Sequence, residues 1–99
     1  MNAAEMREIS KRNGYKKAVR LKKEFVKQVD KEIEKRAEQG YFSIPIPFVE
    51  TDVWKEYELT EAVRIHYKHL GFNVGVEHLT TLTNIYITWA EGDGTYAAD

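Results

Sequence analysis

Two histidines stand three residues apart in the run His66-Tyr67-Lys68-His69, a spacing that can place both imidazoles on one turn of a helix. A protein site for a first-row metal ion usually takes three or more ligands, and the only other histidine is His78. His66 also falls on the apolar side of the expected helix, where an imidazole more often belongs to the core. The chain has no cysteine, so no thiolate can complete the set. The sequence therefore predicts no metal site and no cofactor.

Carboxylates gather just before and within a helix that we expect to end at Leu70: Asp52, Glu56, Glu58 and Glu61. General acid–base catalysis needs two carboxyl groups opposed across a pocket with separated pKa values. Carboxylates near a helix start more often interact with the helix dipole. Ser10 and Ser43 are the only serines, and neither lies in a G-x-S-x-G motif; no glycine-rich phosphate loop is present. We therefore predict no catalytic residue, and a protein that is not an enzyme.

A row of basic residues is the strongest functional signal. The net charge is −1, yet the segment from Arg7 to Lys27 holds nine basic and two acidic residues, whereas the segment from Gln28 to Asp99 holds six and thirteen. On a helix, spacings of three and four residues place five cations on one side: Arg12, Lys16, Arg20, Lys23 and Lys27.

Such a row can be a solvated face, can bind a phosphate backbone, or can bind an acidic protein surface, including that of another copy of the chain. The chain as a whole is slightly acidic, and it shows no helix-turn-helix pattern and no aromatic-studded sheet of the RNA-recognition type. We therefore predict a protein partner, with nucleic acid as the alternative.

A second candidate surface is apolar. It comprises two aromatic residues and two prolines: Trp54, Tyr57, Pro45 and Pro47. Aromatic side chains often anchor protein interfaces. We treat these four residues as the alternative interface. No apolar run approaches the roughly 20 residues that cross a bilayer, so no membrane partner is expected.

A long helix from about Tyr15 to Gln39 is predicted to carry the basic row. Its apolar residues return every three or four positions on the opposite side: Ala18, Leu21, Phe25, Val29 and Ile33. Gly40 is the expected stop. The pair Asn13-Gly14 predicts an interruption before this helix, since both residues tolerate positive φ.

The remaining elements follow from turn residues and alternation. Tyr41–Phe48 alternates with period two, and its two prolines predict an edge strand or an extended polyproline-like segment. A helix runs to Leu70 and ends at Gly71, which should have positive φ. Two antiparallel strands follow, from about Phe72 to Glu77 and from about Thr81 to Ala90. We expect one core from eight residues: Phe25, Val29, Ile33, Leu70, Phe72, Ile85, Ile87 and Trp89.

These elements predict an α+β fold in the order helix, strand, helix, strand, strand. A long N-terminal helix and a second helix pack on a small three-stranded, mainly antiparallel sheet. Residues 1–14 are expected to form an N-terminal helical arm that can move, residues 15–90 a single α+β domain, and residues 91–99 a disordered acidic tail.

Three runs carry a resemblance: Gly40-Tyr41-Phe42-Ser43-Ile44 after a charged helix, Leu70-Gly71-Phe72-Asn73-Val74 at a helix–strand junction, and Ile85-Tyr86-Ile87-Thr88-Trp89 as a closing strand. With this layout the chain resembles small α+β proteins encoded by tailed bacteriophages and prophages. The resemblance implies a compact fold and a viral origin, and it implies no catalytic residue. Pro45, Pro47 and the long basic helix lie outside it.

The predicted function is that of a small non-enzymatic phage protein acting through protein–protein contacts, on a host factor or within an assembly. The alternative is a nucleic-acid-binding accessory protein that uses the basic row. Either function is expected in the cytoplasm of an infected bacterium or in the virion. A homo-oligomer is compatible with both.

Overall fold

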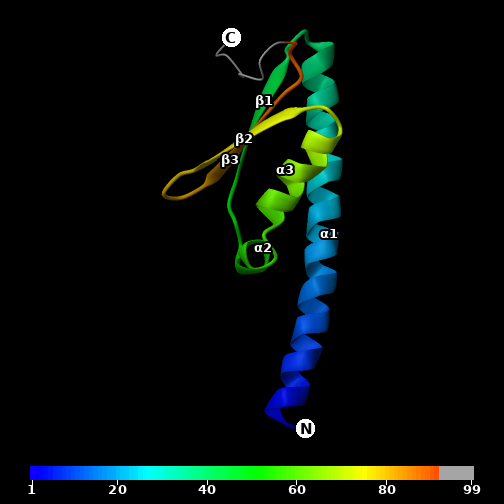
Figure 1. Cartoon of the computed structure of the whole chain (residues 1–99), viewed down its shortest axis with the longest axis vertical. Helices are drawn as coiled ribbons and strands as arrows, with labels where there is room; N and C mark the ends of the chain where they lie inside the picture. The colour runs from blue at the N-terminus through cyan, green and yellow to red at the C-terminus, as the bar shows by residue number, and fades with distance from the viewer. Residues whose placement is uncertain (92–99) are drawn as a thin grey trace.

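The computed structural model describes residues 1–91. Its elements, in chain order, are α1 (Ala3–Glu38), β1 (Ser43–Phe48), α2 (Asp52–Glu56), α3 (Leu59–His69), β2 (Asn73–His78) and β3 (Thr83–Thr88). Figure 1 shows α1 as a long column beside the sheet, with α3 next to it and the N-terminal end of α1 extending past α2. The expected α+β class is confirmed, with the short helix α2 as an addition. The predicted tail lies outside the described residues except for Glu91.

Helix α1 is continuous through Asn13 and Gly14, so the predicted interruption at this pair is wrong. Gly14 allows a close approach instead. The hydroxyl of Tyr57 donates to the carbonyl oxygen of Lys11 at 3.3 Å, and a Cβ built on Gly14 would lie 3.0 Å from that hydroxyl. The absence of a side chain at Gly14 therefore leaves room for Tyr57, the C-cap residue of α2. No break in the helix separates residues 1–14 from the rest of α1.

Both long helices end at a glycine in the left-handed region. Gly71 has φ +95°, as predicted, and its N–H donates to Lys68 while the N–H of Phe72 donates to Tyr67. These two bonds make the Schellman motif, and the edge-on contact between the Tyr67 and Phe72 rings completes it. Gly40 ends α1 in the same way, with φ +88°. The chain therefore turns back toward the sheet at two defined points.

The sheet has the strand order β1-β3-β2, and both pairings are antiparallel. Strand β1 is at an edge, which confirms the prediction from Pro45 and Pro47. A strand can hold two prolines two residues apart when the edge that lacks their N–H groups is unpaired. The central strand β3 is the most buried, with Ile85 and Ile87 almost fully enclosed.

The core lies between the sheet and the helices. Of the eight predicted core residues, Val29, Ile33, Ile85 and Ile87 are buried, whereas Phe25, Phe72 and Trp89 are partly buried against them.

Leu70 was predicted wrongly, since it is 61% exposed. It is the C-cap residue of α3, and the last buried residue of that helix is instead Tyr67, which is fully buried. Within residues 1–91, no helix combines the length and the apolar content that a membrane crossing requires.

Candidate functional site

The basic face of α1 is the first candidate site, and we use this name for Arg12, Lys16, Arg20, Lys23 and Lys27. All five residues are exposed, and the buried residues Ala18, Val29 and Ile33 occupy the other side of the helix. Among the described residues none of the five forms an ion pair. At about 1.5 Å of rise per residue, the row extends for about 22 Å along the helix. Its charge is thus available to a partner over several turns.

On the same side of α1, the charge of the exposed residues changes from positive to negative near the C-terminus of the helix. Glu34 and Glu38 follow the row at helical spacing, and both are exposed. A partner lying along α1 would therefore meet cations over the middle turns and carboxylates over the last two. Such a polar arrangement favours one direction of binding over the other, because like charges in contact are costly.

A shallow groove runs beside the basic face, between α1 and α3. It is lined by Val19, Lys22, Lys23, Val26 and His66 and has a volume of about 300 Å³. Val19 is 51% exposed, and Lys23 belongs both to the groove and to the basic face. Apolar and cationic surfaces are therefore contiguous here.

The residues of the alternative interface do not form one exposed surface. Trp54 is only 6% exposed and packs edge-on against the rings of Phe25 and Phe48, so it is a core residue. Tyr57 is partly buried and its hydroxyl is bonded to α1. Pro45 and Pro47 are exposed on β1. The two prolines are therefore accessible to a partner, whereas Trp54 is not.

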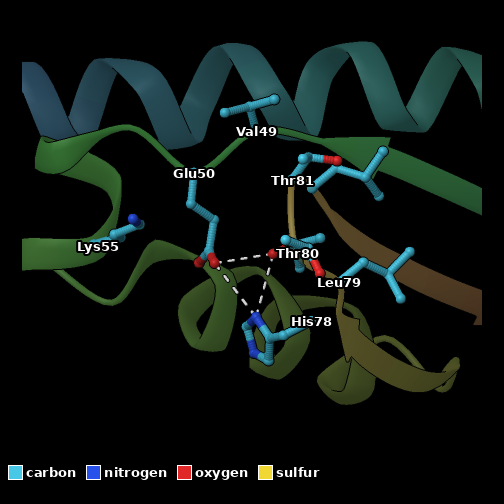
Figure 2. Close-up of a pocket in the computed structure, with 9 residues that line it drawn as sticks. Val49, Glu50, Lys55, His78, Leu79, Thr80 and Thr81 are labelled. Atoms are coloured by element: carbon cyan, nitrogen blue, oxygen red, sulfur yellow. Dashed lines mark hydrogen bonds and ion pairs between the residues drawn. The ribbon is translucent and has the colours of Figure 1, made fainter.

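A partly buried carboxylate, Glu50, joins four segments of the chain and was not identified from the sequence. It lies between β1 and α2, and Figure 2 shows its side chain pointing toward His78. Thr60 of α3 donates to its Oε2 at 2.7 Å, and Thr83 of β3 donates to its Oε1 at 2.9 Å. The indole N–H of Trp54 in turn donates to the Thr60 hydroxyl at 2.7 Å. Each donor thus fastens one element to the same carboxyl group.

The electrostatics keep Glu50 ionised. Burial raises the pKa of this carboxyl, but the hydrogen bonds from Thr60 and Thr83 and the charges of His78 and Lys55 outweigh it, so the pKa is lowered. Nδ1 of His78 lies 3.4 Å from Oε1 of Glu50. The side chain of Glu50 is 16% exposed and that of His78 is 64% exposed. The pair therefore stands at the boundary between core and solvent.

Two pockets meet at this pair. One of about 150 Å³ extends to the β2–β3 turn, and one of about 360 Å³ extends toward α3; Glu50, Lys55 and His78 line both. A carboxylate that accepts a hydrogen bond from the Nδ1–H of an imidazole can orient that ring to act as a base. However, the two hydroxyls closest to Glu50 donate to it and are not poised as nucleophiles. We interpret the cluster as a structural fastening of the helices to the sheet.

The paired histidines of α3 are not brought to a metal-binding cluster. The ring of His66 packs edge-on against Tyr67, with ring centroids 4.9 Å apart. Among residues 1–91 there is no group of three or more potential His, Cys, Asp or Glu ligands.

No local signal in the sequence singles out Glu50. Its partners follow 10, 28 and 33 residues later along the chain. Only a correct packing of α3, β2 and β3 brings them together.

Comparisons of this chain with models of protein families, with curated proteins and with solved structures find no match.

Proposed function

We propose that this chain is a small non-enzymatic protein, encoded by a tailed phage or prophage, that binds an acidic protein through the basic face of α1. One observation carries the proposal: five exposed cations lie in a row on one helix, and none is neutralised by a carboxylate within residues 1–91. Such a row produces a positive potential that steers an acidic partner into contact.

The groove beside the row favours a protein over a nucleic acid. Protein interfaces combine charged rims with apolar centres, and the groove supplies Val19 and Val26 next to the cations. A phosphate backbone presents charged groups, which do not pack favourably on apolar side chains. Contacts with single-stranded nucleic acid commonly use aromatic stacking, and neither valine can provide it.

Nucleic acid is the second candidate, because a row of about 22 Å could follow several phosphates of a duplex. Salt separates the two candidates. With phosphates, the logarithm of the binding constant should fall linearly with the logarithm of salt concentration, with a slope set by the number of neutralised phosphates. With a folded acidic surface, the dependence should be shallower and should saturate.

The experiment is an affinity capture from the bacterial host, with and without nuclease treatment. It compares the wild type with two charge-matched variants: Arg20→Glu/Lys27→Glu on the basic face and Lys31→Glu/Lys35→Glu on exposed positions of the same helix outside it. The proposal expects a stoichiometric acidic protein that survives nuclease, is retained by the second variant and is lost from the first. Retention by both variants, or loss on nuclease treatment, would contradict it.

A further inference from the structure

A hydrogen bond joins α1 and α3, the two helices that line the groove. The hydroxyl of Tyr67 on α3 donates to the carboxylate of Asp30 on α1 at 2.7 Å and lies 3.2 Å from the carbonyl oxygen of Val26. Tyr67 is fully buried, whereas Asp30 is exposed, so the hydrogen bond lies at the edge of the core. A preformed groove binds with a smaller entropic cost than one that must be ordered by its ligand.

The lining of the groove is selective in its chemistry. Val19 and Val26 provide an apolar floor, His66 closes the side that belongs to α3, and Lys22 and Lys23 provide cations. Within residues 1–91, no carboxylate lines the groove. The occupant must therefore bury apolar side chains while presenting negative charge to the two lysines.

The spacing of the lining residues suits a helical occupant. Val19 and Val26 are seven residues apart, which is about 10.5 Å or two helical turns along α1. A helix lying along α1 would present apolar residues at positions i and i+7, with acidic residues on the flank that meets the lysines. Amphipathic helices bind grooves in other proteins with this kind of repeat.

We propose that this groove is the seat of an acidic amphipathic helix of the partner protein, an inference that rests on the proposed function. The apolar residues of that helix pack on Val19 and Val26, and its carboxylates pair with Lys22 and Lys23. The remaining basic face extends the charged contact along α1.

The probe is a fluorescein-labelled synthetic peptide of about 18 residues, long enough to form a helix, with leucines at i, i+4 and i+7 and glutamates beside them. Two further peptides serve as controls: one of the same composition in scrambled order, and one with every leucine replaced by glutamine. Fluorescence anisotropy measures binding to the full chain at low salt. We expect the amphipathic peptide to bind at least tenfold more tightly than either control.

Variants of the protein locate the contact. Val19→Asn should weaken binding of the amphipathic peptide about tenfold or more, whereas Ile9→Asn should leave it unchanged. Ile9 is a matched control, because it is a β-branched residue on the same helix, is 40% exposed and does not line the groove. Lys22→Glu/Lys23→Glu should weaken binding, whereas Lys31→Glu/Lys35→Glu should not. Circular dichroism confirms that each variant is folded.

Equal binding of the amphipathic and scrambled peptides, or an unaltered affinity of Val19→Asn, would overturn the groove as the seat. Failure of every peptide to bind would overturn it too. If the leucine-free peptide binds as well as the others and loses binding with Arg20→Glu/Lys27→Glu, the basic face is used without the groove, and the proposed function stands. A dimer in sedimentation that dissociates with Val19→Asn would assign the groove to a second copy and overturn the inference.

Discussion

The hydroxyl of Tyr67 donates to the carboxylate of Asp30 at 2.7 Å and thereby joins α3 to α1. The two residues are 37 positions apart in the chain. Burial and the neighbouring Asp30 carboxylate raise the pKa of Tyr67 well above its usual range, so the hydroxyl keeps its proton and remains a donor. This contact joins α1, which carries the basic face, to α3, which lines the groove together with α1.

Replacing Tyr67 with phenylalanine tests that contact. The ring and its packing remain, but Asp30 loses a donor, so the free energy of unfolding should fall by about 1–2 kcal/mol. Chemical denaturation followed by circular dichroism measures the change. Tyr41→Phe is the control, because Tyr41 is 46% exposed and the change should be less than about 0.5 kcal/mol. Equal stability of the wild type and Tyr67→Phe would show that the hydrogen bond contributes nothing.

Glu50 should make the stability depend on pH in the acidic range. Its pKa is lowered in the folded state from an ordinary value of 4.5, so its contribution is present above that value and is lost as the pH falls through the lower folded pKa. Glu50→Gln should destabilise the protein by about 1–3 kcal/mol at neutral pH, and the difference should shrink toward pH 3.

Urea denaturation between pH 3 and pH 7 measures this effect. Glu56→Gln is the control, since Glu56 is exposed, and its stability profile should run parallel to that of the wild type. A constant difference between Glu50→Gln and the wild type at all pH values would show that the two threonines do not distinguish the carboxylate from the amide.

Gly71→Val should destabilise the protein by about 1–2 kcal/mol, because φ is +95° at this position and a β-branched residue resists that conformation. Space does not limit the substitution, since no atom of residues 1–91 other than those of its chain neighbours lies within 4 Å of a Cβ built there. Gly71→Asn should cost less, because asparagine tolerates the left-handed region. Thermal unfolding ranks the three proteins, and equal melting temperatures for valine and asparagine would disprove the backbone argument.

Trp54→Phe should destabilise the protein by about 1–3 kcal/mol, because it removes both buried ring area and the indole N–H that donates to Thr60. Trp89→Phe should cost less, since Trp89 is only partly buried. Denaturant unfolding gives both values. If Trp89→Phe has the larger effect, the core is centred closer to the end of β3 than the structure indicates.

Reversing Lys16, Arg20, Lys23 and Lys27 to glutamate should leave folding intact and abolish binding to acidic partners. Each side chain is exposed and makes no ion pair within residues 1–91, so each reversal should change stability by no more than about 0.5 kcal/mol. Far-UV circular dichroism checks the fold, and the capture experiment checks binding. A variant that no longer folds would show that the row contributes to the helix itself.

The sequence by itself determined the features that depend on neighbours in the chain. The glycine at position 71 favoured a left-handed helix end, and the prolines at 45 and 47 favoured an edge strand or an extended polyproline-like segment. The periodicity of α1 separated the basic face from the buried side that contains Val29. Each of these follows from the backbone preferences or the periodicity of a short segment, which act before any long-range contact forms.

Tertiary structure decided the features that depend on which surfaces meet. The sequence predicted a helix interruption at Gly14, but α1 is continuous there. The glycine leaves room for the Tyr57 hydroxyl to approach the carbonyl oxygen of Lys11. The sequence predicted Trp54 as part of an exposed interface. Its burial depends on contacts with Phe25 and Phe48, which belong to two other elements. Glu50 carried no local signal, because its hydroxyl donors come from α3 and β3. Packing between distant segments determines which residues are buried and which form hydrogen bonds. A local sequence pattern does not specify that packing.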